Sequence, residues 1–148
     1  MALRISTVAD SISNLSVAGL TICDIDQVKV NADNRISSLV PNDEYITDVL
    51  QEINSFGGGS ALMTLSYNLN YRLFYKPVGT GRSMTLEQIS GLVALIGLIW
   101  DAFLAIGVLS GCEDITIANI SAFGVVLDPA DNPWWGCILG FRVKEFVR

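Results

Sequence analysis

Hydrophobic and polar residues alternate most regularly in residues 63–75, MTLSYNLNYRLFY. Every second residue from Met63 to Tyr75 is apolar or aromatic, and the residues between them are polar except for Phe74. Because successive side chains of a strand point to opposite faces of a sheet, this pattern predicts a long strand with one buried face. Pro77 should end the strand, since proline has no N–H to donate to a neighbouring strand.

Further strands are predicted on both sides of this one. Residues 115–127 and 134–146 are joined by DPADNP (128–133), whose proline, aspartate and asparagine are typical of a hairpin loop. Residues 20–30 suggest another strand, although their alternation breaks in the middle. Residues 31–60 are polar, rich in turn formers and end in FGGGS, which predicts a long loop or arm.

Two helices are predicted by apolar spacings of three and four residues. The first has Ile5, Val8, Ile12 and Leu15 on one face. The second, at 85–110, begins with Thr85 and Gln88 at the spacing of a capping box. Within it, residues 89–109 contain a single charged residue, Asp101, and are long enough to cross a bilayer.

The long helix is predicted to lie in a folded domain rather than in a membrane. Asp101 would cost roughly 2.5–3.5 kcal/mol in the middle of a bilayer, and no basic cluster flanks the segment. The spacing also divides the helix into two faces. The bulky face, which should pack on a sheet, contains Leu92, Leu95, Ile96, Ile99, Phe103 and Ile106. The small face, which would admit a second backbone, contains Ser90, Ala94, Gly97, Asp101 and Ala105.

Together these elements predict an α+β fold in a single domain spanning residues 1–148. A mostly antiparallel sheet would pack against one long central helix and the N-terminal helix, because strands joined by a short connector pair antiparallel and a helix after a strand covers one face. The loop at 31–60 would leave this domain as an arm.

Composition suggests that the chain buries surface against other subunits. Apolar residues make up 51% of the chain and charged residues only 16%, whereas ordinary soluble domains carry about 25% charged residues. The net charge is −6, and nothing resembles the basic surface of a nucleic-acid-binding protein. The acidic residues concentrate in the first part of the chain, where Asp24, Asp26, Asp33, Asp43 and Glu44 lie.

No residue pattern predicts catalysis, a metal site or a cofactor. The chain has no histidine, which removes the commonest general base. The three cysteines, Cys23, Cys112 and Cys137, lack zinc-ligand spacing and are expected to be free thiols. A lone DID at 24–26 is a weak metal motif, and GTGR at 79–82 lacks the ending of a phosphate-binding loop. The adjacent Trp134 and Trp135 are either interface anchors or a hairpin packing on its own sheet.

The order of these elements resembles that of the tail terminator and tail-to-head joining proteins of long-tailed bacteriophages. The resemblance covers most of the chain: a short N-terminal helix, a long loop after the first strand, the alternating strand, one long helix and a hairpin ending in ILGFRVKEFV. It implies a non-enzymatic virion protein, assembled in the host cytoplasm. The resemblance implies that it forms a ring, hexameric in this family, between the tail tube protein and the connector on the head side.

In such a ring the candidate subunit-interface residues are Ser90, Ala94, Gly97, Asp101, Trp134, Trp135 and Arg142. The five acidic residues named above would line the channel or the arm, so that DNA passes without adhering to the ring, because like charges repel. Two alternatives remain open: another neck, head-completion or tube subunit of a phage, and a small oligomeric α+β ligand-binding domain. No membrane association is expected.

Overall fold

The computed structural model describes residues 5–24, 27–28, 36–54, 62–78, 85–105 and 112–147. These residues form two helices and five strands: α1 (Ile5–Ser13), β1 (Leu20–Ile22), β2 (Ser37–Asn54), β3 (Leu62–Pro77), α3 (Leu86–Ala105), β4 (Cys112–Leu127) and β5 (Pro133–Val147). The strands form one sheet in the order β1-β2-β3-β5-β4. The short β1 pairs parallel with β2, and the other neighbouring strands are antiparallel.

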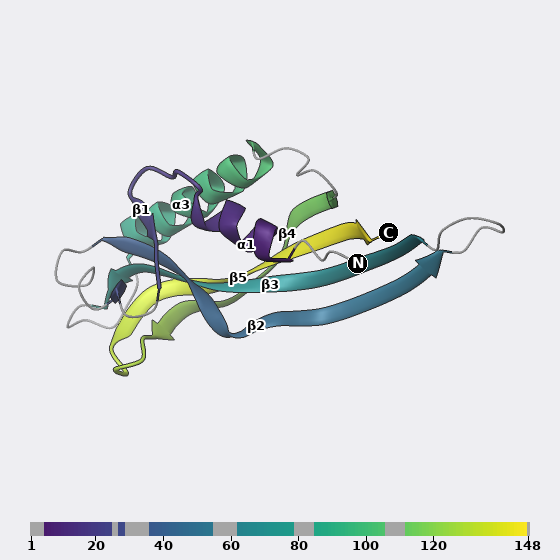
Figure 1. Ribbon diagram of the computed structural model, residues 1–148. Helices are drawn as coiled ribbons and strands as arrows, with labels where there is room; N and C mark the ends of the chain where they lie inside the picture. The colour runs from purple at the N-terminus through teal and green to yellow at the C-terminus, as the bar shows by residue number, and fades with distance from the viewer. Residues whose placement is uncertain are drawn as a thin grey trace.

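The predicted α+β fold class is wrong. Strands account for more than half of the described residues, and the sheet curls into a half-barrel with the two helices in its hollow (Figure 1). The fold is therefore mostly β, and the sheet, rather than a central helix, organises it. The β2–β3 hairpin also extends well beyond the helices in Figure 1, so part of the sheet has no helix against it.

The largest difference lies in residues 31–60, for which a loop or arm was predicted. Ser37–Asn54 form the 18-residue strand β2 instead. Polar side chains of β3 hold this strand in place despite its turn-forming residues. Asn70 donates hydrogen bonds to the Glu44 carbonyl (3.0 Å) and to Thr47 Oγ1 (2.8 Å), and Asn68 donates one to Asp48 Oδ2 (3.0 Å). The register of the β2–β3 pair shifts at two places along this contact, so the bonds stabilise an irregular strand.

The alternation in β3 has the predicted consequence. Its odd-numbered residues, including Tyr67, Leu69 and Leu73, are buried in the main core on the helix side, while the even-numbered residues from Ser66 to Arg72 are partly exposed on the other face. Residues of β5 join this core, and the ring of Phe141 stacks on that of Phe103 in α3 at 4.4 Å between centroids. The predicted hairpin and N-terminal helix are also observed.

Strands β3 and β5 approach closely because β5 contains a glycine at the right place. A Cβ atom at Gly136 would overlap the carbonyl oxygen of Leu73 on β3. Only a residue without a side chain fits this backbone contact. A second, smaller core lies on the face of the sheet away from the helices, where Phe74 and Trp134 meet at 5.5 Å between ring centroids.

Candidate subunit interface around helix α3

Helix α3 begins at the predicted capping box. The Thr85 backbone N–H donates to Gln88 Oε1 (3.0 Å), and the Gln88 N–H donates to Thr85 Oγ1 (3.2 Å). These two bonds satisfy N–H groups that have no partner within the helix, and Glu87 adds a negative charge in the positive first turn. The cap fixes where α3 starts, and therefore which side chains face the sheet. The predicted end near 110–111 lies outside the described residues.

The inner face of α3 packs as predicted. Leu92, Leu95, Ile96, Ile99 and Phe103 are all buried in the main core. Ile106, the sixth predicted member of this face, lies outside the described residues. Burying large aliphatic and aromatic side chains stabilises by about 1.5–3 kcal/mol each, so this face fixes the helix in the hollow of the sheet.

The outer face of α3 is the largest departure from the predicted surface. Ser90, Ala94, Gly97 and Asp101 are exposed, as a small face available to a neighbour requires. Beside them, however, stands a row of large apolar side chains, which we call the α3 ridge: Leu86 (82% exposed), Ile89 (36%), Val93 (54%), Trp100 (38%) and Leu104 (55%). Large apolar side chains that stay exposed along one helical face indicate an interaction site.

By length and composition, Leu86–Leu104 could cross a membrane, and only 28% of this segment is buried within the subunit. The buried part is the same inner face that fills the main core. A bilayer could therefore surround α3 only if the helix left the hollow of the sheet and exposed the apolar faces of β3 and β5. A membrane span would dismantle the fold, whereas contact through the ridge alone leaves it intact.

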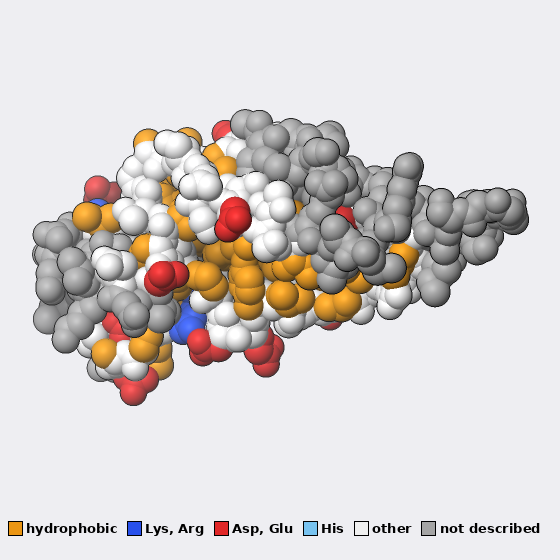
Figure 2. Space-filling model, in the orientation of Figure 1, with side chains coloured by type: hydrophobic (Ala, Val, Ile, Leu, Met, Phe, Trp, Pro, Cys, Tyr) orange, Lys and Arg blue, Asp and Glu red, His pale blue; other side chains and the backbone are white. Residues whose placement is uncertain are grey.

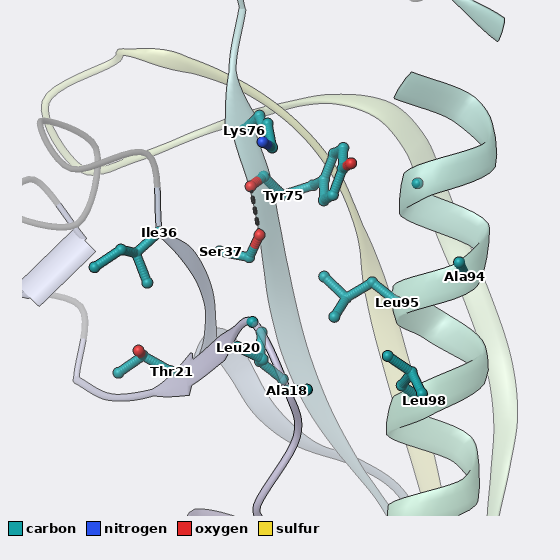
Figure 3. Close-up of a pocket in the computed structure, with 12 residues that line it drawn as sticks. Ala18, Leu20, Thr21, Ile36, Ser37, Tyr75, Lys76, Ala94, Leu95 and Leu98 are labelled. Atoms are coloured by element: carbon teal, nitrogen blue, oxygen red, sulfur yellow. Dashed lines mark hydrogen bonds between the residues drawn. The ribbon is translucent and has the colours of Figure 1, made fainter. Parts of the chain in front are cut away.

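A cavity of about 590 Å³ lies on the other flank of α3, between the helix and the edge of the sheet at β1. We call it the α3 groove. Leu95 and Leu98 project from the helix toward Leu20 of β1 in Figure 3. The lining also includes small residues on both sides of the cavity: Ala18, Gly19, Gly91 and Ala94. The polar residues of its lining include Thr21, Ser37, Tyr75 and Lys76.

Tyr75 shapes one end of the groove. Its ring lies against Gly91, where a Cβ atom would overlap the tyrosine hydroxyl. The Tyr75 carbonyl accepts a hydrogen bond of 2.7 Å from Ser37 Oγ, drawn in Figure 3, which ties β3 to the start of β2. The next residue, Lys76, is exposed, with its ammonium group 5.8 Å from the centre of the Tyr75 ring. The groove thus has an apolar floor and a positive charge at its rim.

The tryptophan pair is not part of an exposed interface. Trp134 and Trp135 are 1% and 5% exposed, so neither is accessible as an anchor for a partner. Trp134 packs in the smaller core, and its Nε1 donates to Asp128 Oδ2 at 3.2 Å. The predicted interface role is therefore wrong for these two residues, and the alternative reading, a hairpin packing on its own sheet, is the observed one.

Arg142 is also engaged within the subunit. It lies on the face of the sheet away from the helices, where its Nη1 donates to the Asp48 carbonyl (2.9 Å) and to Asn68 Oδ1 (3.1 Å). These bonds connect β5 to β3 and β2 across three strands. Arg142 is partly buried, and its described contacts are those of a structural residue rather than of an interface contact.

The predicted acidic residues are only partly brought together. Asp24 follows β1 and lines a small cavity with Pro41 of β2, and Asp43 and Glu44 lie just beyond on the same strand. Asp43 forms an ion pair of 2.8 Å with Arg72, which leaves its own side chain 92% exposed. Figure 2 shows acidic side chains gathered below an apolar band, in the region of β2. Asp26 and Asp33 lie outside the described residues.

The side chains with potential for metal binding or catalysis are carboxylates, thiols and tyrosine hydroxyls. Among the described residues, no group of three or more histidine, cysteine, aspartate or glutamate side chains could hold a metal ion. Cys137 is a free thiol, and burial raises its pKa to about 12, which leaves it protonated at neutral pH. The side chain of Cys112 is outside the described set. Tyr45 and Tyr71 share a hydrogen bond of 2.6 Å, and burial raises the pKa of both hydroxyls.

No protein-family model matches the chain, and a comparison with curated proteins gives no match. The surface of α3 is therefore the feature from which a function can be inferred. The sequence already carried one signal for the ridge that was missed. Val93, Trp100 and Leu104 recur at spacings of seven and four residues, which places them on one helical face. They lie outside the row of bulky residues that was assigned to the core.

Proposed function

We propose that this protein is a non-enzymatic structural subunit that assembles with copies of itself into a ring, and that the ring is a tail terminator or neck component of a long-tailed bacteriophage. The observation that carries the proposal is the outer face of α3, where large apolar side chains stay exposed on a helix whose other face is fully packed. Exposed apolar surface of this extent needs a partner, and a second copy of the chain is always available to supply one.

The composition supports self-assembly for the same reason. A chain with 51% apolar and 16% charged residues has little polar side-chain material for its surface. Subunits of a ring bury two lateral surfaces each, and interfaces between obligate partners are more apolar than other surfaces. Assembly through α3 also leaves the core intact, unlike insertion of the helix into a bilayer.

The β2–β3 hairpin offers a second surface, suited to contacts along the axis of the ring. It extends past the helices in Figure 1, and Val49 and Leu50 on β2 are 60% and 53% exposed. In a terminator this hairpin would contact the tail tube protein or the head-side connector. The acidic residues Asp43 and Glu44 on the same strand would face the DNA path, where their charge discourages adhesion.

The proposal is tested by measuring the mass of the purified protein without detergent, by light scattering at several concentrations, together with negative-stain electron microscopy. We expect a discrete particle of about six times the 16.0 kDa subunit mass, with a central opening. The same particles added to purified tail tubes should bind at the tube ends. A subunit that stays monomeric at every concentration, or that dissolves only in detergent, would contradict the proposal. Particles that stack into tubes would indicate a tube subunit instead.

A further inference from the structure

The two flanks of α3 differ: one carries large exposed apolar side chains, and the other lines a cavity. Leu98, which lines the groove, and Leu104, which belongs to the ridge, are six residues apart, and six residues turn a helix through 600°, which places their side chains about 120° apart around its axis. One subunit therefore presents the ridge and the groove in different directions and cannot fill its own groove with its own ridge.

We infer that the α3 ridge of one copy docks in the α3 groove of the next, in a head-to-tail contact that repeats around the ring. This inference rests on the proposed function, because it names the interface through which the proposed ring closes. A contact between two different surfaces leaves one ridge and one groove open in every pair. Further copies can therefore add until the rotation between neighbours closes the ring. A two-fold contact of ridge against ridge would instead end at a dimer and leave both grooves empty.

The groove has the dimensions and chemistry to receive the ridge. Its volume of about 590 Å³ lies within the range of sites that enclose sizeable apolar groups. Leu95 and Leu98 supply an apolar wall, and the small, exposed Ala94 leaves room for a second helix. The ridge supplies Trp100, a side chain enriched at the centre of interfaces because it buries a large area with few rotatable bonds.

Charge complementarity fixes the direction of the contact. Asp101 lies next to the ridge and is exposed, and it forms no ion pair with any described residue. Lys76, at the rim of the groove, is the basic residue of the described lining. When the ridge of one copy enters the groove of its neighbour, Asp101 and Lys76 come from different subunits and have opposite charges. Opposite charges across an interface favour the correct partner and orientation.

Charge reversal of each residue, followed by mixing, tests the pair. Asp101→Lys alone would place two lysines at every contact, and Lys76→Glu alone would place two acids there, so each variant should assemble about tenfold more weakly. In an equal mixture, alternating copies restore one Asp101–Lys76 contact and create one Lys–Glu contact. The mixture should therefore form rings at the wild-type concentration. Asp10→Lys, an exposed reversal on α1, is the matched control and should assemble as wild type.

The outcomes separate the inference from the proposed function. Wild-type rings with both single variants unaffected, or with no rescue on mixing, would overturn the ridge-in-groove contact and leave the ring itself standing. A wild-type protein that stays monomeric, or that binds lipid vesicles through α3, would overturn both. Should a variant fail to fold, oxidising a mixture of Asp101→Cys and Lys76→Cys gives the same information. A cross-linked dimer should form in the mixture, above the background of the native cysteines, and in neither variant alone.

Discussion

At the scale of single residues, Asp128 shows how one buried side chain organises the β4–β5 loop. The residue is 4% exposed. Its Oδ1 accepts hydrogen bonds from the backbone N–H groups of Ala130 and Asn132 at 2.9 Å each, and its Oδ2 accepts bonds from Asn132 Nδ2 and Trp134 Nε1 at 3.2 Å each. Burial alone would raise the pKa of Asp128, but these donors outweigh it and lower the pKa below 3.8. The folded hairpin therefore favours the charged carboxylate.

Asp128→Asn should lower the free energy of unfolding by about 2 kcal/mol at pH 7, because the charge-assisted bonds are lost in a buried site. The difference between wild type and variant should shrink on acidification. A depressed pKa stabilises the folded state above the unfolded value of 3.8, and this contribution is lost as the pH falls through the folded pKa. Denaturant titrations of both proteins at pH 7, 5, 4 and 3 would measure the trend.

Asp131→Asn is the matched control, since Asp131 lies in the same loop but is exposed. Asparagine also tolerates the left-handed backbone of this residue (φ 60°). Its free energy of unfolding should stay within about 0.5 kcal/mol of wild type. A constant difference between wild type and Asp128→Asn from pH 7 to pH 3 would contradict the role assigned to the carboxylate.

At the scale of elements, the two faces of α3 have different roles. The inner face stabilises the folded subunit, and the outer face carries the ridge proposed to mediate assembly. Leu92 is fully buried, and Leu104 is 55% exposed on the ridge. Leu92→Ala should therefore cost about 2–5 kcal/mol of unfolding free energy, from lost burial and the cavity left behind. Leu104→Ala should change the stability of the dissociated subunit by about 0.5 kcal/mol or less.

Denaturant unfolding of both variants at a concentration too low for assembly would measure these costs, and light scattering at high concentration would measure assembly. We expect Leu104→Ala to weaken assembly although it leaves the subunit stable. Equal costs for the two variants in the dissociated subunit would mean that the ridge is packed within the chain. If Leu104→Ala assembles as fully as the wild type, Leu104 does not belong to the interface.

The elements that the sequence predicts correctly are those whose signals are local. The alternation of β3, the Thr85–Gln88 cap and the loop at 128–133 each depend on residues close together in the chain. Strand β2 was missed because its cause is not local. Asp43, Glu44 and Asp48 have low strand propensity, and they are held in the sheet by side chains of β3 and β5 that are distant in sequence. The fold class was wrong for the same reason.

The candidate interface was predicted in part. The small residues of α3 are exposed as expected, because a 3.6-residue period assigns faces reliably. The interface prediction for Trp134 and Trp135 was wrong because the sheet has a buried core on both of its faces near these residues. The alternation of a single strand does not reveal the second core. The groove also escaped prediction, since it is formed by β1, β2, β3 and α3 together.

At the scale of the whole molecule, assembly and stability should be linked. If the ring buries the apolar face of α3, dissociation must accompany unfolding, and the thermal midpoint Tm should depend on protein concentration. We expect Tm to rise by about 5 °C over a hundredfold increase in concentration. Differential scanning calorimetry of wild type and Asp101→Lys would measure it, and the variant should show a smaller rise. A Tm independent of concentration in wild type would indicate a folded monomer.

The order of strands has a consequence for how the chain reaches its native state. β5 follows β4 in sequence, but it lies between β3 and β4 in the sheet. The β4–β5 hairpin can form locally, whereas the pairing of β3 with β5 must close over α3 and β4, and such distant contacts form slowly. Until then β3 carries an open edge that the hairpin of another chain could occupy. Rapid synthesis should therefore favour chains that exchange hairpins, and slower synthesis should favour correctly closed subunits.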